Sequence, residues 1–126
     1  MNETQFRDWL DAYGRAWQQG DAKATMTLFA AGASYHETPF DPPLAGLDAI
    51  HDYWKAGAGQ TQTDVTFTYE VLDFANNRGI AHWRATFLRL PAGTAVRLDG
   101  LLVARFNRAG RCKEFREWWH REETAA

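Results

Sequence analysis

The sequence predicts an α+β fold: a cone-shaped, curved antiparallel sheet wrapped around three N-terminal helices. In the first half of the 126 residues, apolar side chains recur at the three- and four-residue spacing of amphipathic helices. In the second half they alternate with polar residues in four long segments, as in a meander of antiparallel strands. Such a sheet buries one face, and the helices are the elements available to cover it.

The first helix is predicted by apolar residues at helical spacing, and Gly20 marks its end. These residues are Phe6, Trp9, Leu10, Tyr13 and Trp17. Asp21 is expected to cap a second, short helix that buries Met26 and Phe29. A short strand over residues 33–37 follows, and it stops at the prolines after it because proline cannot donate to a strand ladder.

Residues 47–55 predict the third helix, which the glycines at 57 and 59 end. The four long strands are predicted over residues 65–75, 79–90, 95–106 and 111–120, with turn sequences between them. The tail from Glu123 onward is expected to fray. In the third of these strands, Val96, Leu98, Gly100, Leu102 and Phe106 form an apolar face, and Arg97, Asp99 and Arg105 lie on the other.

Composition limits the classes of function. A chain of 126 residues, 45% of them hydrophobic, suits one globular domain over residues 1–126. The net charge of −2 and the scattered basic residues argue against nucleic acid. There is no apolar run of about 18 residues, so no membrane span is expected, and a polar start without a signal-peptide pattern favours the cytoplasm. The four histidines lack metal-site spacing, so neither metal nor cofactor is expected.

Three segments resemble the nuclear transport factor 2-like superfamily, which includes ketosteroid isomerase, scytalone dehydratase and the SnoaL-like polyketide cyclases. Residues 12–30, "AYGRAWQQGDAKATMTLFA", are similar to the opening helix pair of these proteins. Residues 45–54, "AGLDAIHDYW", resemble their third helix, and residues 105–119, "RFNRAGRCKEFREWW", resemble their last hairpin. The resemblance covers nearly the whole chain and implies a single SnoaL-like domain. It does not imply one activity, since the superfamily holds isomerases, dehydratases, cyclases, hydrolases and binding domains.

The resemblance to the isomerase implies part of a catalytic set. Tyr13 matches the tyrosine of the isomerase oxyanion hole, and Trp54 matches a second pocket tyrosine. The general-base aspartate corresponds to Glu37 without a gap, or to Thr38 when the following proline is aligned. The second acid of the oxyanion hole corresponds to Leu102, which cannot donate a hydrogen bond. The set is therefore incomplete, and steroid isomerisation is not predicted.

Glu117 is the strongest candidate for a reactive group. Strand alternation places it on one face with Phe115 and Trp119, so its carboxyl lies between two aromatic rings. Such surroundings disfavour the charged form and raise the pKa of a carboxyl toward neutrality. The alternative is a structural ion pair between Glu117 and a neighbouring arginine, Arg84 or Arg89.

A second carboxylate, Glu37, is expected to share the work of Glu117. His36 and Glu37 alternate, so a regular strand turns only one of them inward. We expect Glu37, although His36, through a bulge before Pro39, and Thr38 are also open. The two carboxylates could then divide acid and base roles, with Tyr13 donating to a developing oxyanion. The expected pocket wall comprises Tyr35, Trp54, Trp83, Phe87, Leu98, Leu102, Phe115 and Trp119.

Two functions remain open. The first is a cofactor-independent isomerase, cyclase or dehydratase that moves a proton on a small hydrophobic or aromatic molecule. The second is a non-catalytic ligand-binding or association domain, so the sequence does not decide whether the chain is an enzyme. Trp118, with Arg105 and Arg116, lies on the face opposite the apolar one, which predicts a homodimer through the outer sheet face.

Overall fold

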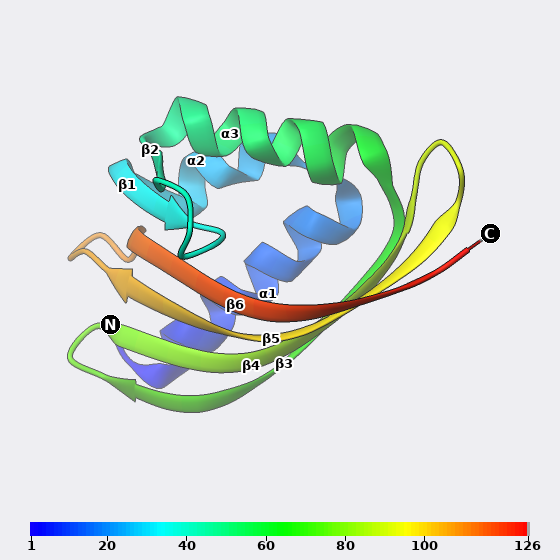
Figure 1. Cartoon of the computed structure of the whole chain (residues 1–126). Helices are drawn as coiled ribbons and strands as arrows, with labels where there is room; N and C mark the ends of the chain where they lie inside the picture. The colour runs from blue at the N-terminus through cyan, green and yellow to red at the C-terminus, as the bar shows by residue number, and fades with distance from the viewer. Residues whose placement is uncertain (126) are drawn as a thin grey trace.

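The computed structural model describes residues 1–125, so the last residue of the expected 1–126 domain lies outside the described part. Helices pack on the concave side of a six-stranded curved sheet (Figure 1), which confirms the predicted α+β fold. The helices are α1 (Glu3–Gln19), α2 (Thr25–Leu28) and α3 (Leu47–Ala56), with a 3-10 turn at Ala22–Ala24 and a π-helical turn at Gly57–Thr61. Within residues 1–125, no helix is long and apolar enough to cross a membrane.

Helix α1 has well-formed ends and a strongly aromatic buried side. Asn2 caps it: the Asn2 side chain accepts from the Gln5 N–H, and the Gln5 side chain accepts from the Asn2 N–H. At the other end Gly20 adopts a left-handed conformation with φ of 63° and donates to the carbonyls of the last turn. The predicted helix is confirmed; Phe6, Trp9, Leu10 and Tyr13 of its apolar face are buried, and Trp17 is half-buried.

The second helix differs from the prediction. Asp21 makes no side-chain capping bond, and a 3-10 turn precedes the single turn of α2. Met26 is exposed, because one turn of helix presents only a narrow face to the core. Phe29 is buried as expected, but it opens strand β1 (Phe29–His36), which is longer than the predicted 33–37 segment.

The four long strands form the predicted meander. They are β3 (Gln62–Ala75), β4 (Arg78–Arg89), β5 (Thr94–Phe106) and β6 (Cys112–Thr124). Strand β6 extends into the first two residues of the segment expected to fray, because its pairing with β5 runs to Ala95 opposite Thr124. The sheet is mixed and not purely antiparallel, since β1 pairs parallel to β6 and carries the short β2 (Leu44–Ala45) at its outer edge.

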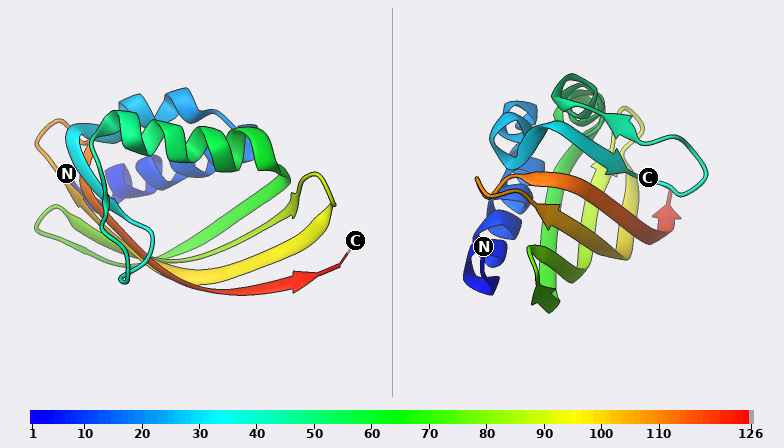
Figure 2. Two further views of the ribbon diagram at one scale, coloured as in Figure 1. Left: turned by 45° about the horizontal axis from the view of Figure 1, so that its top comes forward. Right: turned by 90° about the vertical axis from the view of Figure 1, so that its left-hand side faces the viewer.

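The curvature of the sheet creates an inside and an outside. Figure 2 shows the helices on the concave side and leaves the convex side uncovered. In β5, Val96, Leu98, Leu102 and Phe106 are buried, whereas Arg97, Asp99 and Arg105 are exposed, as alternation predicted. Gly100 lets β5 and β6 meet closely here, because an added Cβ would lie 2.1 Å from the Trp118 main-chain oxygen.

Candidate functional site

A cavity of about 380 Å³ lies between the helices and the concave face of the sheet, within the size range of small-molecule sites. Its wall is mainly aromatic, with rings from Tyr13, Trp17, Tyr35, Tyr53, Trp54, Trp83, Phe87 and Trp119. Four charged side chains also line it: Glu37, Arg89, Glu117 and Arg121. A wall made largely of aromatic rings favours a ligand that is itself largely apolar.

Most of the residues expected at the site from the sequence lie in this wall. They are Tyr13, Tyr35, Glu37, Trp54, Trp83, Phe87, Leu98, Glu117 and Trp119. Leu102 and Phe115 were expected there too, but both are fully buried in the core instead. The ring of Phe115 stacks on Tyr13 and Tyr35, with centroids 5.5 and 4.7 Å apart, and these tyrosines are the ones that reach the cavity.

Glu117 is a buried carboxyl without a cationic partner in the part of the chain that the structure describes. Its exposed fraction is only 7%, and none of the ion pairs within residues 1–125 includes it. Arg84 pairs with Asp99, with Nε and Oδ2 2.9 Å apart, and Arg89 pairs with Glu123. The structural ion pair with either arginine, which the sequence left as an alternative, is therefore not formed.

The surroundings of Glu117 shift its ionisation strongly. Burial raises the pKa of the Glu117 carboxyl to about 8, and the charge of Glu37 adds to the rise. A hydrogen bond with Trp119 opposes the shift without cancelling it. The carboxyl is therefore mainly protonated at neutral pH, yet a useful fraction is ionised, which suits a group that donates or accepts a proton.

Tyrosine hydroxyls surround the two carboxylates. Burial, and then the charge of Glu117, raises the pKa of both Tyr13 and Tyr35, and their hydroxyls are close enough to hydrogen-bond with each other. Burial, and then the charges of Glu117 and Glu37, also raises the pKa of Tyr53, which reaches the cavity from α3. All three phenols therefore keep their protons at neutral pH and can act as donors.

The segment after β1 places three polar residues differently. Glu37 is half-buried and lines the cavity. His36 does not line it; its Nε2 lies 3.2 Å from the Ser34 hydroxyl, and burial followed by the charge of Arg116 lowers its pKa. Thr38 is outside the wall as well and accepts a bond from the Phe40 N–H. Of the three, only Glu37 is positioned to act on a bound molecule.

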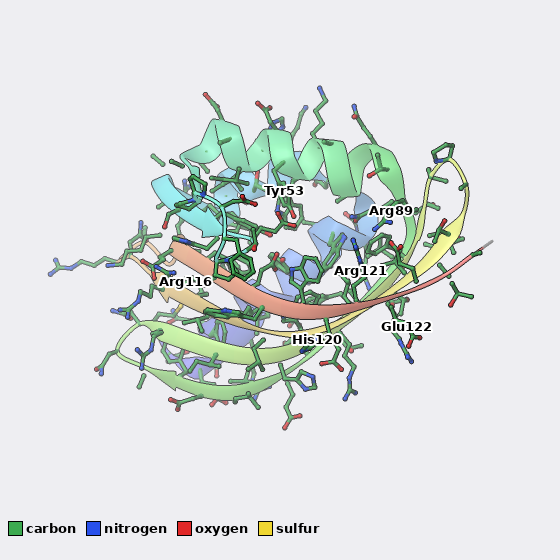
Figure 3. The ribbon with its side chains drawn as sticks, viewed as in Figure 1. Tyr53, Arg89, Arg116, His120, Arg121 and Glu122 are labelled. Atoms are coloured by element: carbon green, nitrogen blue, oxygen red, sulfur yellow. The ribbon has the colours of Figure 1, made fainter. Side chains whose placement is uncertain are left out.

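Several wall residues were missed from the sequence. Trp17 was predicted only as an apolar residue of the first helix, but it reaches the cavity and donates from Nε1 to the Gln62 side chain at 2.6 Å. Arg89 and Arg121 also face inward (Figure 3). Extending the alternation of Phe87 by two residues gives Arg89, and that of Trp119 gives Arg121. Strand alternation therefore predicts that both arginines face the cavity.

Within residues 1–125, no three or more histidine, cysteine or acidic side chains are grouped so that they could hold a metal ion. Cys112 is buried, and burial raises the pKa of its thiol, so it is a poor nucleophile. The ionisable groups at the cavity are carboxyl, phenol and guanidinium groups.

The chain is similar to known proteins both in sequence and in structure. The family model described as "SnoaL-like domain" matches residues 7–115. Among solved structures, a computationally designed 17-OHP binder superposes with a TM-score of 0.80 at 17% identity, covering 94% of this chain and 96% of that one. A Bacillus subtilis protein, provisionally described as an isomerase, superposes with a TM-score of 0.80 at 23% identity, covering 95% and 90%. No curated protein sequence matches this chain significantly.

Proposed function

Because this chain belongs to the SnoaL-like domain family of the nuclear transport factor 2-like superfamily, we propose that its cavity binds a small hydrophobic or aromatic molecule and moves a proton on it. The observation that carries the proposal is Glu117: a buried carboxyl in an aromatic cavity, with a pKa of about 8 and no cationic partner among the described residues. The reaction class is a cofactor-independent isomerisation, cyclisation or dehydration.

The two carboxyls take different roles because their surroundings differ. Glu117 is buried and holds its proton at neutral pH, so it is the proton donor to a ligand atom beside it. Glu37 is half-buried and lines the same cavity, so it is placed to accept a proton and return it to solvent. Tyr13 keeps its hydroxyl proton and is the donor to an oxygen on which negative charge develops.

The second candidate is a binding domain without turnover. Leu102 supports it, because this buried leucine stands where the isomerase resemblance places a second oxyanion-hole acid. A transition state with negative charge on oxygen then loses one of its donors, which costs about a hundredfold or more in rate. The designed 17-OHP binder shows that a chain with this fold can bind a ligand by design.

One experiment separates the two candidates. Ligands that co-purify with the protein would be identified by native mass spectrometry and then incubated with the wild type, Glu117→Gln and the control Glu114→Gln. Glu114 lies on the same strand but pairs with Arg105 and Arg116 on the outer face. Product formed by the wild type and the control, but not by Glu117→Gln, supports the enzyme. A ligand that binds to all three proteins and is never converted favours the binding domain.

We also propose that two copies associate through the convex sheet face. Trp118 and Leu101 face each other across β5 and β6, with exposed fractions of 46% and 43%. These two exposed apolar side chains, with Arg105 and Arg116 nearby, could be buried against the same surface of a second copy. Sedimentation velocity at micromolar concentration should give a dimer, and Trp118→Asp should give a monomer. A monomeric wild type would reject the interface.

The extent and location of the domain belong to the same proposal. We take residues 1–126 as one domain that acts in the cytoplasm. The single cysteine, Cys112, is free and buried, which suits a reducing compartment. Cell fractionation of a tagged chain tests the location, and a cytoplasmic fraction lacking the protein would contradict it.

A further inference from the structure

The rim of the cavity carries two arginines that the proton-transfer proposal does not use. Resting on that proposed function, we infer that the ligand carries a negatively charged group, of which a carboxylate is the simplest, and that this group binds Arg89 and Arg121. The apolar body of the ligand then lies among the aromatic rings and reaches toward Glu117.

Both arginines belong to the inner face of the sheet. Arg89 ends β4 and follows the inward-facing Phe87, and Arg121 follows the inward-facing Trp119 on β6; both line the cavity. Their side chains are partly exposed, as expected at a rim. Figure 3 shows both on the cavity side of β6, below α3, whereas His120 and Glu122 project from the opposite side.

The charges at this rim do not balance. Arg89 pairs with the Glu123 carboxylate through Nη1 and Oε1, and Arg121 Nε lies 3.9 Å from the same oxygen. Two guanidinium groups therefore share one carboxylate at this rim, whereas the other acidic wall residues, Glu37 and Glu117, lie farther along β6, where β1 pairs with it. By contrast, Arg97 and Glu122 on the convex face form a one-to-one pair at 2.8 Å. An excess guanidinium charge beside an apolar cavity attracts an anion, and guanidinium geometry suits carboxylate.

The position of the arginines sets the arrangement of the ligand. Glu117 and Arg121 lie on the same face of β6, four residues apart, so their Cα atoms are roughly 13 Å from each other. The ring of Trp119 stands between them, and the Arg121 guanidinium carbon lies 6.0 Å from its centroid. A flat apolar ligand can pack on this indole while its anion meets the arginines. This arrangement keeps the anion away from Glu117, whose ionisation it would oppose.

Glu123 contacts both arginines. A ligand anion must displace its carboxylate, at least from Arg121, where the contact is longer. Removing the Glu123 charge should therefore strengthen the binding of anionic ligands and leave neutral ligands unaffected.

The test compares naphthylacetate with naphthylacetamide, which share an aromatic body and differ in charge. Isothermal titration calorimetry at low salt would measure both with the wild type, Arg89→Gln, Arg121→Gln and Glu123→Gln. Arg97→Gln is the matched control, because Arg97 is an ion-paired arginine on the convex face. We expect the wild type to bind the acid about three- to tenfold more tightly than the amide. Each inner-face arginine variant should lose that preference, and Glu123→Gln should increase it.

The outcomes distinguish this inference from the proposed function. Equal binding of acid and amide by the wild type, unchanged in the arginine variants, rejects the anion site and leaves the apolar cavity in place. The anion site is also rejected, and the apolar cavity stays in place, if the amide binds and the acid does not. The anion site is likewise rejected if Arg97→Gln has as large an effect on binding as Arg121→Gln. If neither compound binds, the anion site is rejected, and the proposed function is decided separately by the turnover of the co-purified ligand by the wild type and Glu117→Gln.

Discussion

Replacing Glu117 by glutamine should make the protein more stable at alkaline pH, which is unusual for the removal of a buried polar group. Glutamine keeps the volume of the side chain and cannot ionise. In the wild type, burial raises the pKa of Glu117 from its ordinary value of 4.5 to about 8. The folded protein therefore binds a proton that the unfolded chain has already released, and its free energy of unfolding falls as the pH rises through this window.

The size of the effect follows from the two pKa values. Below pH 4.5 the carboxyl is protonated in both the folded and the unfolded protein, and it does not lower the free energy of unfolding. Above pH 8 it is ionised in both, and it lowers the free energy of unfolding by the full amount. The difference between the two pKa values lowers the free energy of unfolding by roughly 5 kcal/mol at pH 9 and by roughly 3 kcal/mol at pH 7. Glu117→Gln escapes this cost, so its free energy of unfolding should match the wild type near pH 5 and exceed it progressively above.

Urea unfolding of both proteins at pH 5, 7 and 9 measures the difference. Glu114→Gln is the control, because that glutamate pairs with arginines on the outer face and should show no such gain at alkaline pH. If Glu117→Gln instead loses about 3 to 5 kcal/mol at neutral pH, the carboxylate was paired in the folded protein. That result would refute the unpaired buried acid and the mechanism built on it.

Three further changes have definite expected outcomes. Glu37→Gln removes a charge that raises the pKa of Glu117, so the pKa of Glu117 should fall in this variant. Carboxyl NMR measures this pKa, and an unchanged value would mean that the two carboxyls do not interact. Tyr13→Phe should reduce turnover of an identified substrate by about a hundredfold with a smaller change in affinity, and unaltered turnover would exclude it as the oxyanion donor. Gly100→Ala should lower the free energy of unfolding in urea by about 1 to 3 kcal/mol, because its Cβ would lie 2.1 Å from a main-chain oxygen. Gly32→Ala, which has open space around it, is the control. Equal stability of the two variants would contradict the close approach of the strands at Gly100.

The candidate site could be predicted in part because it is built from alternating strands. Glu117 and Trp119 follow from the alternation of β6, and Tyr13 follows from the helical spacing of α1. Arg89 and Arg121 obey the same alternation, but each stands near a strand end, and the tail that continues β6 was expected to fray. Boundaries of elements depend on pairing with other strands, which a single segment does not encode.

The sequence by itself determined the α+β class, the first and third helices, the meander and the inward sides of β5 and β6, because these depend on local spacing and turn residues. Only the tertiary structure decided that β1 runs parallel to β6, which brings Glu37 beside Glu117. It also decided that Phe115 and Leu102 lie in the core behind the cavity wall, and that Arg84 and Arg89 bind other carboxylates and leave Glu117 unpaired. These outcomes depend on contacts between residues far apart in the chain, whose distances are set by the curvature of the whole sheet.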